Sequence, residues 1–469
     1  MAELHWMAAY ELADLIRRRE LKPSELMTAT LARIEALNPK LNAFCALRAD
    51  AALAEARALD ERVARGADPG PLAGLPLGVK DLADVAGMAT TYGSTPFKDH
   101  IAARDSIEVA RLKAAGAIVV GKTNTPEFGH MAFTRNLLHG VTRNPWNLER
   151  TPGGSSGGSS AAIAAGMTPL ATGSDWGGSI RIPACYVGAF GLKTTQGRIP
   201  LDARLGMQQW VDFAVVGPIT RTVRDAALYL DATAGYDPAD PSSLPHPGIS
   251  YAATLERMPK RLRVGFHPDF GRPIEPEVRA AAARAAAVFR ELGHELTVLD
   301  EPVIETCHAW RTIGSFQSLA DLAEHFAGRE DQFGRAFIAS VKAAAKITAR
   351  DYGAAFRVRA QFNEWMRDIF ARFDLLLTPT VPTEAFAASG PPPKVIDGRE
   401  LEDVMQALTF TYPFNFSGHP AASVRAGLGA NGLPAGLQIV AERHRDDLVM
   451  QAAYSYERAR PWNRDWPRL

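Results

Sequence analysis

The residues with the clearest capacity for chemistry are serines set among glycines between Gly153 and Gly178. This stretch holds 8 glycines in 26 residues, against 39 in the 469 residues of the whole chain. Paired glycines let backbone segments approach closely and turn their N–H groups toward a ligand. A linker would also be rich in Gly and Ser, but the pairs here flank the small-residue segment 161–166 and lead into apolar residues that must be buried. The stretch therefore predicts a site rather than a linker.

Other active-site patterns match the sequence, but in the wrong structural context. Residues 153–157 fit the G-x-S-x-G elbow of α/β-hydrolases, which must follow a strand, and the preceding NPWNLERTP cannot form one. Residues 116–123 fit the Walker A expression, but their middle residues, Ala-Ile-Val-Val, form a buried strand instead of an open phosphate loop. The 11 histidines include no H-x-x-x-H pair, so we expect no metal site.

Six short segments follow one another along the chain in a recognisable order. They are GLPLGVKD (74–81), GAIVVGKTNTPEFG (116–129), NPW (144–146), TPGGSSGG (151–158), GSDWGGSIRIPA (173–184) and GLK (191–193). Together they resemble the amidase signature family, strongly over residues 70–230 and weakly from there to the end of the chain. The ordered set is specific, with 75 residues from Lys80 to Ser155 and 24 from Ser155 to Ser179.

The resemblance implies a Ser-Ser-Lys triad that works without histidine. Ser179 would be the nucleophile that forms an acyl-enzyme, and Lys80 would be the base. Ser155 would bridge the two, on a cis peptide bond that follows Gly154.

Elementary chemistry supports a lysine base at this position. A serine hydroxyl is a poor nucleophile until a neighbour removes its proton. Lysine can do so only when neutral, so its pKa must fall from about 10.4. Lys80 lies in an apolar strand with Leu77, Val79 and Leu82, where desolvation acts in that direction.

The resemblance also implies groups around the triad. Backbone N–H groups would form an oxyanion hole from four consecutive residues, Trp176, Gly177, Gly178 and Ser179. Asp175 and Arg181 would hold this turn, with an ordinary surface ion pair as the alternative, and Ser156 would join the serine network. The substrate pocket is expected to include Gly129, His130 and Met131.

Helix-length and strand-length apolar patterns alternate along the chain, which predicts an α/β fold. Helices are expected over 8–65, with a stop at Asn38-Pro39, and over 276–292, 397–408, 446–460 and most of 303–372. Strands are expected at 77–85, 117–120, 261–266, 295–300 and 374–382. The resemblance implies one large domain over 1–469, with a mixed central β-sheet covered on both faces by α-helices. Its signature core would span 70–230, and 303–372 would line the active-site mouth.

Composition places the chain among globular proteins. Hydrophobic residues make up 46% and charged residues 22%, and the formal net charge is zero. No basic surplus supports nucleic-acid binding, and no apolar run is long enough to span a membrane. Three separated cysteines and the absence of a signal-peptide pattern predict a reducing, cytoplasmic location.

The expected activity is hydrolysis of a carbonyl C–N bond without a cofactor, by a monomer or homodimer. The substrate would be a small amide, anilide or carbamate, with esters as a side activity. Trp176 and the segment 207–213, MQQWVDF, favour an apolar or aryl group, as in aryl acylamidases or urethanases. One alternative is the amidase subunit of a tRNA-dependent amidotransferase, although Thr194 stands where those subunits carry proline. Another is a non-catalytic binding protein, which the three intact triad positions argue against.

Overall fold

The structure is a computed structural model that describes residues 4–201, 212–320, 322, 326–462, 465–467 and 469. The helices are α1 (Ala9–Arg17), α2 (Pro23–Leu41), α3 (Ala49–Ala64), α4 (Ile107–Ala114), α5 (Gly157–Ala164), α6 (Arg181–Val187), α7 (Val223–Thr233), α8 (Tyr251–Thr254), α9 (Pro276–Glu291), α10 (Cys307–Leu319), α12 (Arg335–Ala344), α13 (Ala349–Arg372), α14 (Tyr412–Phe416) and α15 (Asp446–Ala459). The strands are β1 (Phe44–Leu47), β2 (Pro76–Lys80), β3 (Ile118–Thr123), β4 (Arg135–Asn136), β5 (Gly140–Val141), β6 (Leu170–Asp175), β7 (Phe190–Lys193), β8 (Val215–Thr220), β9 (Arg263–Phe266), β10 (Glu295–Val298), β11 (Leu375–Pro379), β12 (Val395–Ile396), β13 (Arg399–Glu400), β14 (Ala421–Leu428) and β15 (Pro434–Val440).

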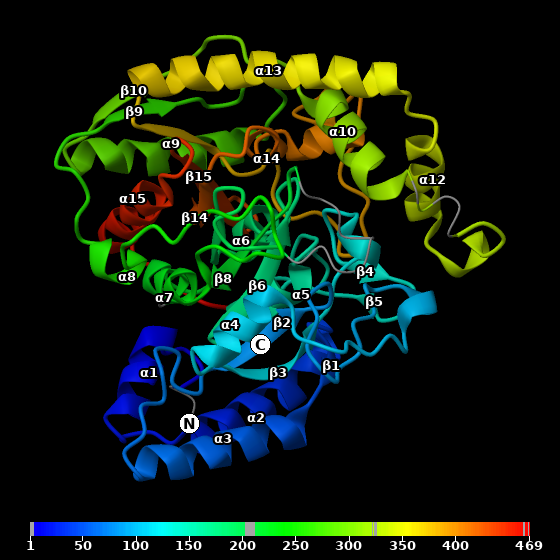
Figure 1. Cartoon of the computed structure of the whole chain (residues 1–469). Coiled ribbons are helices and arrows are strands. Elements are labelled where there is room, and N and C mark those ends of the chain that lie inside the picture. The colour runs from blue at the N-terminus through cyan, green and yellow to red at the C-terminus, as the bar shows by residue number, and fades with distance from the viewer. Residues whose placement is uncertain (1–3, 202–211, 321, 323–325, 463–464, 468) are drawn as a thin grey trace.

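One mixed sheet of eleven strands organises the molecule, in the order β1-β3-β2-β6-β8-β7-β14-β15-β11-β9-β10. β2 pairs in parallel with β3 and β6, and β9 pairs in parallel with β10 and β11. The other neighbouring strands are antiparallel. Figure 1 places the N-terminal helices α1–α3 at one end of the molecule and α13 at the opposite end.

Helices cover the sheet on both faces, as the alternation along β11 shows. Leu375 and Leu377 join a core that includes residues of α7, α9 and α15. Leu376, between them, joins a second core with residues of α6, α10 and α13. Because successive strand residues point to opposite faces, a strand covered on both sides is apolar without interruption. The predicted α/β fold with a helix-covered mixed sheet is confirmed.

The N-terminal prediction was right about helices but wrong about where the second one ends. α2 runs through Pro39 and ends at Leu41. Proline removes one hydrogen bond of the last turn, yet the helix continues for two more residues. Asn42 ends α2 instead, with a φ of 51° in the left-handed region. The short strand β1 also lies inside the segment expected to be helical.

The helix predicted over 397–408 is wrong. Asp397 and Gly398, at φ 49° and 71°, form the turn of a hairpin that joins β12 to β13. Asp-Gly between two short strands is a typical hairpin sequence, because both positions take positive φ. A 3₁₀ helix over Val404–Leu408 is the helical part of this segment.

Most of the other predicted elements are present. The helices predicted at 276–292 and 446–460 are α9 and α15, and the strands predicted at 117–120, 261–266 and 374–382 correspond to β3, β9 and β11. The strand predicted over 77–85 is shorter and ends at Lys80, as β2. Within the described residues, no helix combines the length and the hydrophobicity needed to cross a membrane.

Candidate active site

Lys80 lies at the last position of β2 and its side chain is enclosed by three serines. Its Nζ donates to Ser155 Oγ at 2.7 Å, to Ser156 Oγ at 2.9 Å and to Ser174 Oγ at 2.9 Å. Only 1% of the residue is exposed. Burial lowers the pKa of Lys80 to about 7, against the opposing effect of the Asp175 and Glu108 charges. A substantial neutral fraction is therefore present near pH 7.

Burial alone does not single out Lys80. Lys122 on β3 and Lys193 on β7 are also fully buried, and burial lowers the pKa of both, that of Lys193 to about 7. Lys122 Nζ lies 3.5 Å from Asp81 Oδ1, and Lys193 Nζ donates to Thr194 O at 2.9 Å. In the described part of the chain, Lys80 is the lysine whose amine meets serine hydroxyls. Geometry, and not the pKa, distinguishes it.

The sheet register explains how β6 reaches this lysine. β6 lies beside β2, and its Thr172 Oγ1 accepts a hydrogen bond from Lys80 N at 2.9 Å. Ser174, two residues later, faces the same side because side chains alternate along a strand. The sequence analysis missed Ser174. The spacing of Thr172 and Ser174 within β6, together with a pairing of β6 and β2, was the signal that could have revealed it.

Ser155 and Ser156 lie in the loop before α5. The peptide bond between Gly154 and Ser155 is cis, as the resemblance implies, and Thr125 Oγ1 donates to Ser155 O at 3.0 Å. A Cβ on Gly154 would lie 2.6 Å from Phe133 N, so the site has no room for a larger residue there. α5 begins at Gly157, which keeps both serines at its N-terminal end.

Ser179 lies in the turn between β6 and α6, against the Ser155–Ser156 loop. Ser156 N donates to Ser179 O at 3.2 Å, which connects the two serine segments. Ser179 is partly exposed, whereas Ser155 and Ser156 are buried. Gly178, at φ 129°, gives the turn a conformation that other residues rarely adopt.

A buried ion pair holds this turn. Arg181 Nη2 lies 3.0 Å from Asp175 Oδ1, and both side chains are 0% exposed. Asp175 Oδ1 also accepts from Gly178 N at 2.7 Å, and Oδ2 accepts from Ile180 N at 3.1 Å. The alternative of a surface ion pair is therefore wrong. The N–H of Gly178 is used inside the turn.

Arg181 also connects the turn to the C-terminal part of the chain. Its guanidinium donates to Thr411 O at 2.8 Å, to Asn415 Oδ1 at 2.6 Å and to Gln438 Oε1 at 2.7 Å. Burial by itself would raise the pKa of Asp175, but the Arg181 charge and its hydrogen bonds hold that pKa well below its usual range. Asp175 therefore stays ionised throughout the neutral range.

We expect Asp175→Asn to lower the free energy of unfolding by about 3–5 kcal/mol, because the Arg181 charge would remain buried without its partner. Chemical denaturation at pH 7 measures this loss. The matched control is Asp368→Asn, in the exposed Arg367–Asp368 pair, where about 1 kcal/mol or less is expected. Because the pKa of folded Asp175 is depressed, the wild-type contribution is present above the unfolded pKa and is lost as the pH falls through the folded pKa. Equal small losses for both variants would contradict the anchoring role.

An aromatic pocket lies beside the turn, where the sequence analysis expected substrate. Gly129 and His130 line it together with Trp176. The rest of its wall comes from Phe128, Ser318, Leu319, Leu322 and Phe337. The Phe128 and Phe337 rings stack at 4.6 Å, and burial lowers the pKa of His130 to about 4, so this ring is neutral at pH 7. Met131 is not among the lining residues; its carbonyl oxygen lies against Gly154.

Helix α10 fits closely against the turn. The Trp310 Nε1 donates to Trp176 O at 3.2 Å, and the two indole rings lie 4.9 Å apart. Gly177 has no room for a Cβ beside the Trp310 ring, and Gly314 has none beside the Trp176 ring. The pocket wall and the turn are therefore fitted to each other. The other aromatic segment that the sequence analysis considered, 207–213, lies outside the described residues except for Asp212 and Phe213.

One group of side chains in the described part of the chain has metal-ligand spacing. The ligand atoms of Cys45, Asp81 and His139 lie within 4.8 Å of one another. The Asp81 carboxylate is already paired with Lys122 and accepts hydrogen bonds from the N–H and hydroxyl of Thr91. This group is therefore held together by an ammonium group and hydrogen bonds, and among the described residues none of its side chains hydrogen-bonds to the Lys80 amine.

Comparisons of the sequence and of the structure with known proteins both find amidases. The family model described as Amidase matches residues 25–450. An acylamidase of Rhodococcus erythropolis is 38% identical over 98% of this chain and 96% of its own length. A glutamyl-tRNA(Gln) amidotransferase subunit of Moorella thermoacetica is 36% identical over 100% of this chain and 99% of its own. The crystal structure of a bacterial aryl acylamidase of the amidase signature family superposes with a TM-score of 0.92, at 33% identity, over 98% of this chain and 97% of that one.

Proposed function

The chain belongs to the amidase family and hydrolyses C–N bonds other than peptide bonds, and we propose that it cleaves small amides and anilides through an acyl-enzyme on Ser179. The observation that carries this proposal is the buried Lys80 amine within hydrogen-bond distance of Ser155. The buried amine has a pKa of about 7, and the serine loop that it touches is bonded to Ser179. A buried amine beside a bridging hydroxyl is one part of what a lysine-activated serine nucleophile requires, and the backbone bond keeps Ser179 next to that pair.

In the proposed reaction, neutral Lys80 accepts the Ser155 hydroxyl proton while Ser155 takes the proton of Ser179. The Ser179 oxygen attacks the substrate carbonyl carbon, and the carbonyl π electrons move to the oxygen. The proton held by Lys80 then returns through Ser155 to the leaving nitrogen as the C–N bond breaks. A water molecule attacks the acyl-enzyme by the same relay, which releases the acid and restores Ser179.

The oxyanion donors that we propose are the N–H groups of Gly177 and Ser179. The resemblance implied all of Trp176–Ser179, but the N–H of Gly178 is bonded to Asp175. Within the described residues, Gly177 and Ser179 donate no hydrogen bond from their N–H groups. Donors that are fixed before the reaction stabilise the developing charge most effectively.

We propose that an aryl or bulky apolar group of the substrate packs against the aromatic wall of this small pocket. Phe128, Trp176 and Phe337 present rings beside the proposed oxyanion turn, and His130 is neutral. Aromatic walls bind flat apolar groups by burial and ring contacts. We propose that α10 and α12, within the region 303–372, form the specificity wall of the active-site mouth.

The amidase subunit of a tRNA-dependent amidotransferase is the second candidate. The full-length similarity to the Moorella thermoacetica protein favours it. The sequence departs from those subunits at Thr194, and the aromatic pocket suits a flat apolar group better than a primary amide. The two candidates differ in whether the chain works alone.

The decisive experiment is an assay of the purified chain against anilides, primary amides and aryl carbamates. We expect turnover without a partner protein, with kcat/KM highest for aryl-bearing substrates because of the pocket. If glutamine is the one substrate that is hydrolysed, and only after partner subunits are added, the result would contradict the proposal and support the amidotransferase.

A variant of a residue in the pocket wall tests whether the wall determines the preference for aryl substrates in this assay. Ser318→Leu places a larger side chain at the pocket. We expect it to lower kcat/KM about 10-fold or more for the aryl substrate that the wild type prefers, and to affect acetamide much less. Ser340→Leu is the matched control, because Ser318 and Ser340 each donate to the carbonyl four residues before them and Ser340 is not at the pocket. Equal effects of Ser318→Leu on both substrates would remove the pocket from the binding mode.

A further inference from the structure

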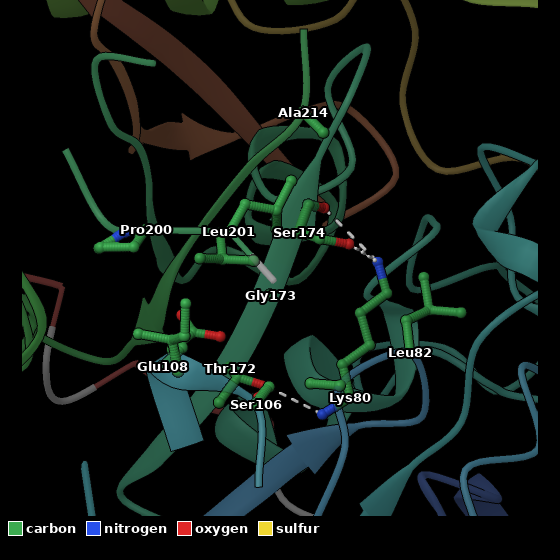
Figure 2. A pocket seen from close by; sticks show the side chains of 13 residues that line it. Lys80, Leu82, Ser106, Glu108, Thr172, Gly173, Ser174, Pro200, Leu201 and Ala214 are labelled. Atoms are coloured by element: carbon green, nitrogen blue, oxygen red, sulfur yellow. Dashed lines mark hydrogen bonds between the residues drawn. The ribbon is translucent and has the colours of Figure 1, made fainter. Parts of the chain in front are cut away.

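A second cavity borders Lys80, separate from the aromatic pocket. Figure 2 shows Lys80 on one side of it, bonded to Ser174, with Glu108 and Leu201 also facing the cavity. Most of the other lining side chains are apolar, among them Ile107 and Val216. Lys80 and Glu108 therefore line the same cavity, and most of the other side chains around it are apolar.

Glu108 is an unusual residue for this position. It lies in the first turn of α4, is only 3% exposed, and accepts a hydrogen bond from the Tyr229 hydroxyl of α7 at 2.5 Å. A buried carboxyl group normally has a cationic partner or several donors, because burying its charge is costly. No salt bridge to Glu108 occurs among the described residues, and the triad chemistry proposed above makes no use of it.

We propose that Glu108 is a positioning residue that controls, across this cavity, the pH at which Lys80 becomes neutral. The proposal rests on the proposed function of Lys80 as the base. The ionised carboxylate stabilises the ammonium form of Lys80, and the protonated carboxyl group does not. Both residues are buried among mostly apolar side chains, which screen this interaction much less than water would.

The neighbouring groups determine the sign of the effect. Burial raises the pKa of Glu108 to about 8, against the Tyr229 hydrogen bond and the Lys80 charge, which lower it. Asp175 on β6 is the other acidic group that acts on Lys80, and Tyr229 is the other titratable group that acts on Glu108. As the pH rises, Glu108 loses its proton over the same pH range as Lys80. The negative charge that forms on Glu108 favours the ammonium form of Lys80, so Lys80 keeps its proton to a higher pH. The pair therefore titrates as a coupled system over a broad range.

The test is the pH profile of kcat/KM for wild type, Glu108→Gln and Tyr229→Phe. Glu108→Gln keeps the shape of the side chain and removes its charge. The ascending limb of the kcat/KM profile should therefore move by about one pH unit toward acid and become steeper. Tyr229→Phe removes the donor that favours ionised Glu108, so it should move the limb in the same direction by less. Glu457→Gln is the matched control: burial raises the pKa of Glu457 to about 8 as well, without an effect on Lys80, and the limb should stay in place.

The outcomes separate this inference from the proposed function. If Glu108 has only a structural role, Glu108→Gln should lower the melting temperature and the rate but leave the ascending limb of the pH profile in place. That result overturns the inference. If Glu108→Gln does not fold, an unmoved limb in Tyr229→Phe overturns it equally. Lys80→Ala should lose the limb. A limb that survives in Lys80→Ala overturns the proposed function, and the inference with it.

Discussion

Replacing Ser179 with alanine is expected to lower kcat for amides by about four orders of magnitude or more, while the protein stays folded. No other hydroxyl can take the place of a covalent nucleophile once its oxygen is removed. The Ser179 backbone N–H, a proposed oxyanion donor, is kept in this variant. Steady-state assays at high enzyme concentration, with substrate still in excess, measure the residual kcat, and circular dichroism checks the fold.

Labelling locates the nucleophile directly. A fluorophosphonate should modify wild-type protein at Ser179, as read by peptide mass mapping, and should leave Ser179→Ala unlabelled. Ser155→Ala is the matched control, because it removes a hydroxyl from the relay but leaves Ser179 to react slowly. An adduct on Ser155 in the wild type would mean that the G-x-S-x-G segment holds the nucleophile.

Lys80→Ala is expected to lower kcat/KM for amides by about 10³-fold or more and to remove its rise with pH. Burial lowers the pKa of Lys80 to about 7, and only the neutral amine accepts a proton. The wild-type rate should therefore increase as the pH rises through about 7 and level off in the alkaline range. Lys80→Arg should be equally inactive, because a guanidinium stays charged at every accessible pH.

Two comparisons make the lysine result specific. Esters have leaving groups that need little protonation, so Lys80→Ala should slow anilides more than matched aryl esters. Lys193→Met is the matched control, since burial also lowers the pKa of Lys193 to about 7 but its amine bonds Thr194 O. Lys193→Met should keep the pH profile even where it costs stability. Equal losses on amides and esters, with an unchanged profile, would make Lys80 structural and leave the base unidentified.

The elements around the site were predictable where a local pattern determined them. The apolar residues of β3 and β11 are buried on both faces, and the sequence shows this directly as uninterrupted apolar runs. The end of α2 depended on whether Pro39 or Asn42 stops the helix, a choice between two competing local signals. The hairpin at Asp397-Gly398 had its own signal, which the helical interpretation overlooked.

The contacts of the proposed site were predictable in part, and those of the pocket wall less so. Motifs placed Lys80 and Ser155 in one proposed site, and their side chains lie 2.7 Å apart although 75 residues separate them in the sequence. Ser174 required knowledge that β6 lies beside β2, which sequence periodicity does not contain. Likewise, nothing local to Ser318 or Phe337 indicates that they line one pocket with Trp176, because that arrangement depends on how α10 and α12 pack across the molecule.

The hydrogen bonds of Arg181 have a consequence for the time course of synthesis. Its partners Thr411 and Gln438 follow it by 230 and 257 residues. Every residue proposed for the relay has left the ribosome long before them. At about 5–20 residues per second, the nascent chain spends roughly ten seconds or more carrying the relay without the groups that fix its turn. The turn proposed for catalysis thus gains its last fixing contacts only after β15, the strand that contains Gln438, has been synthesised and joins the sheet.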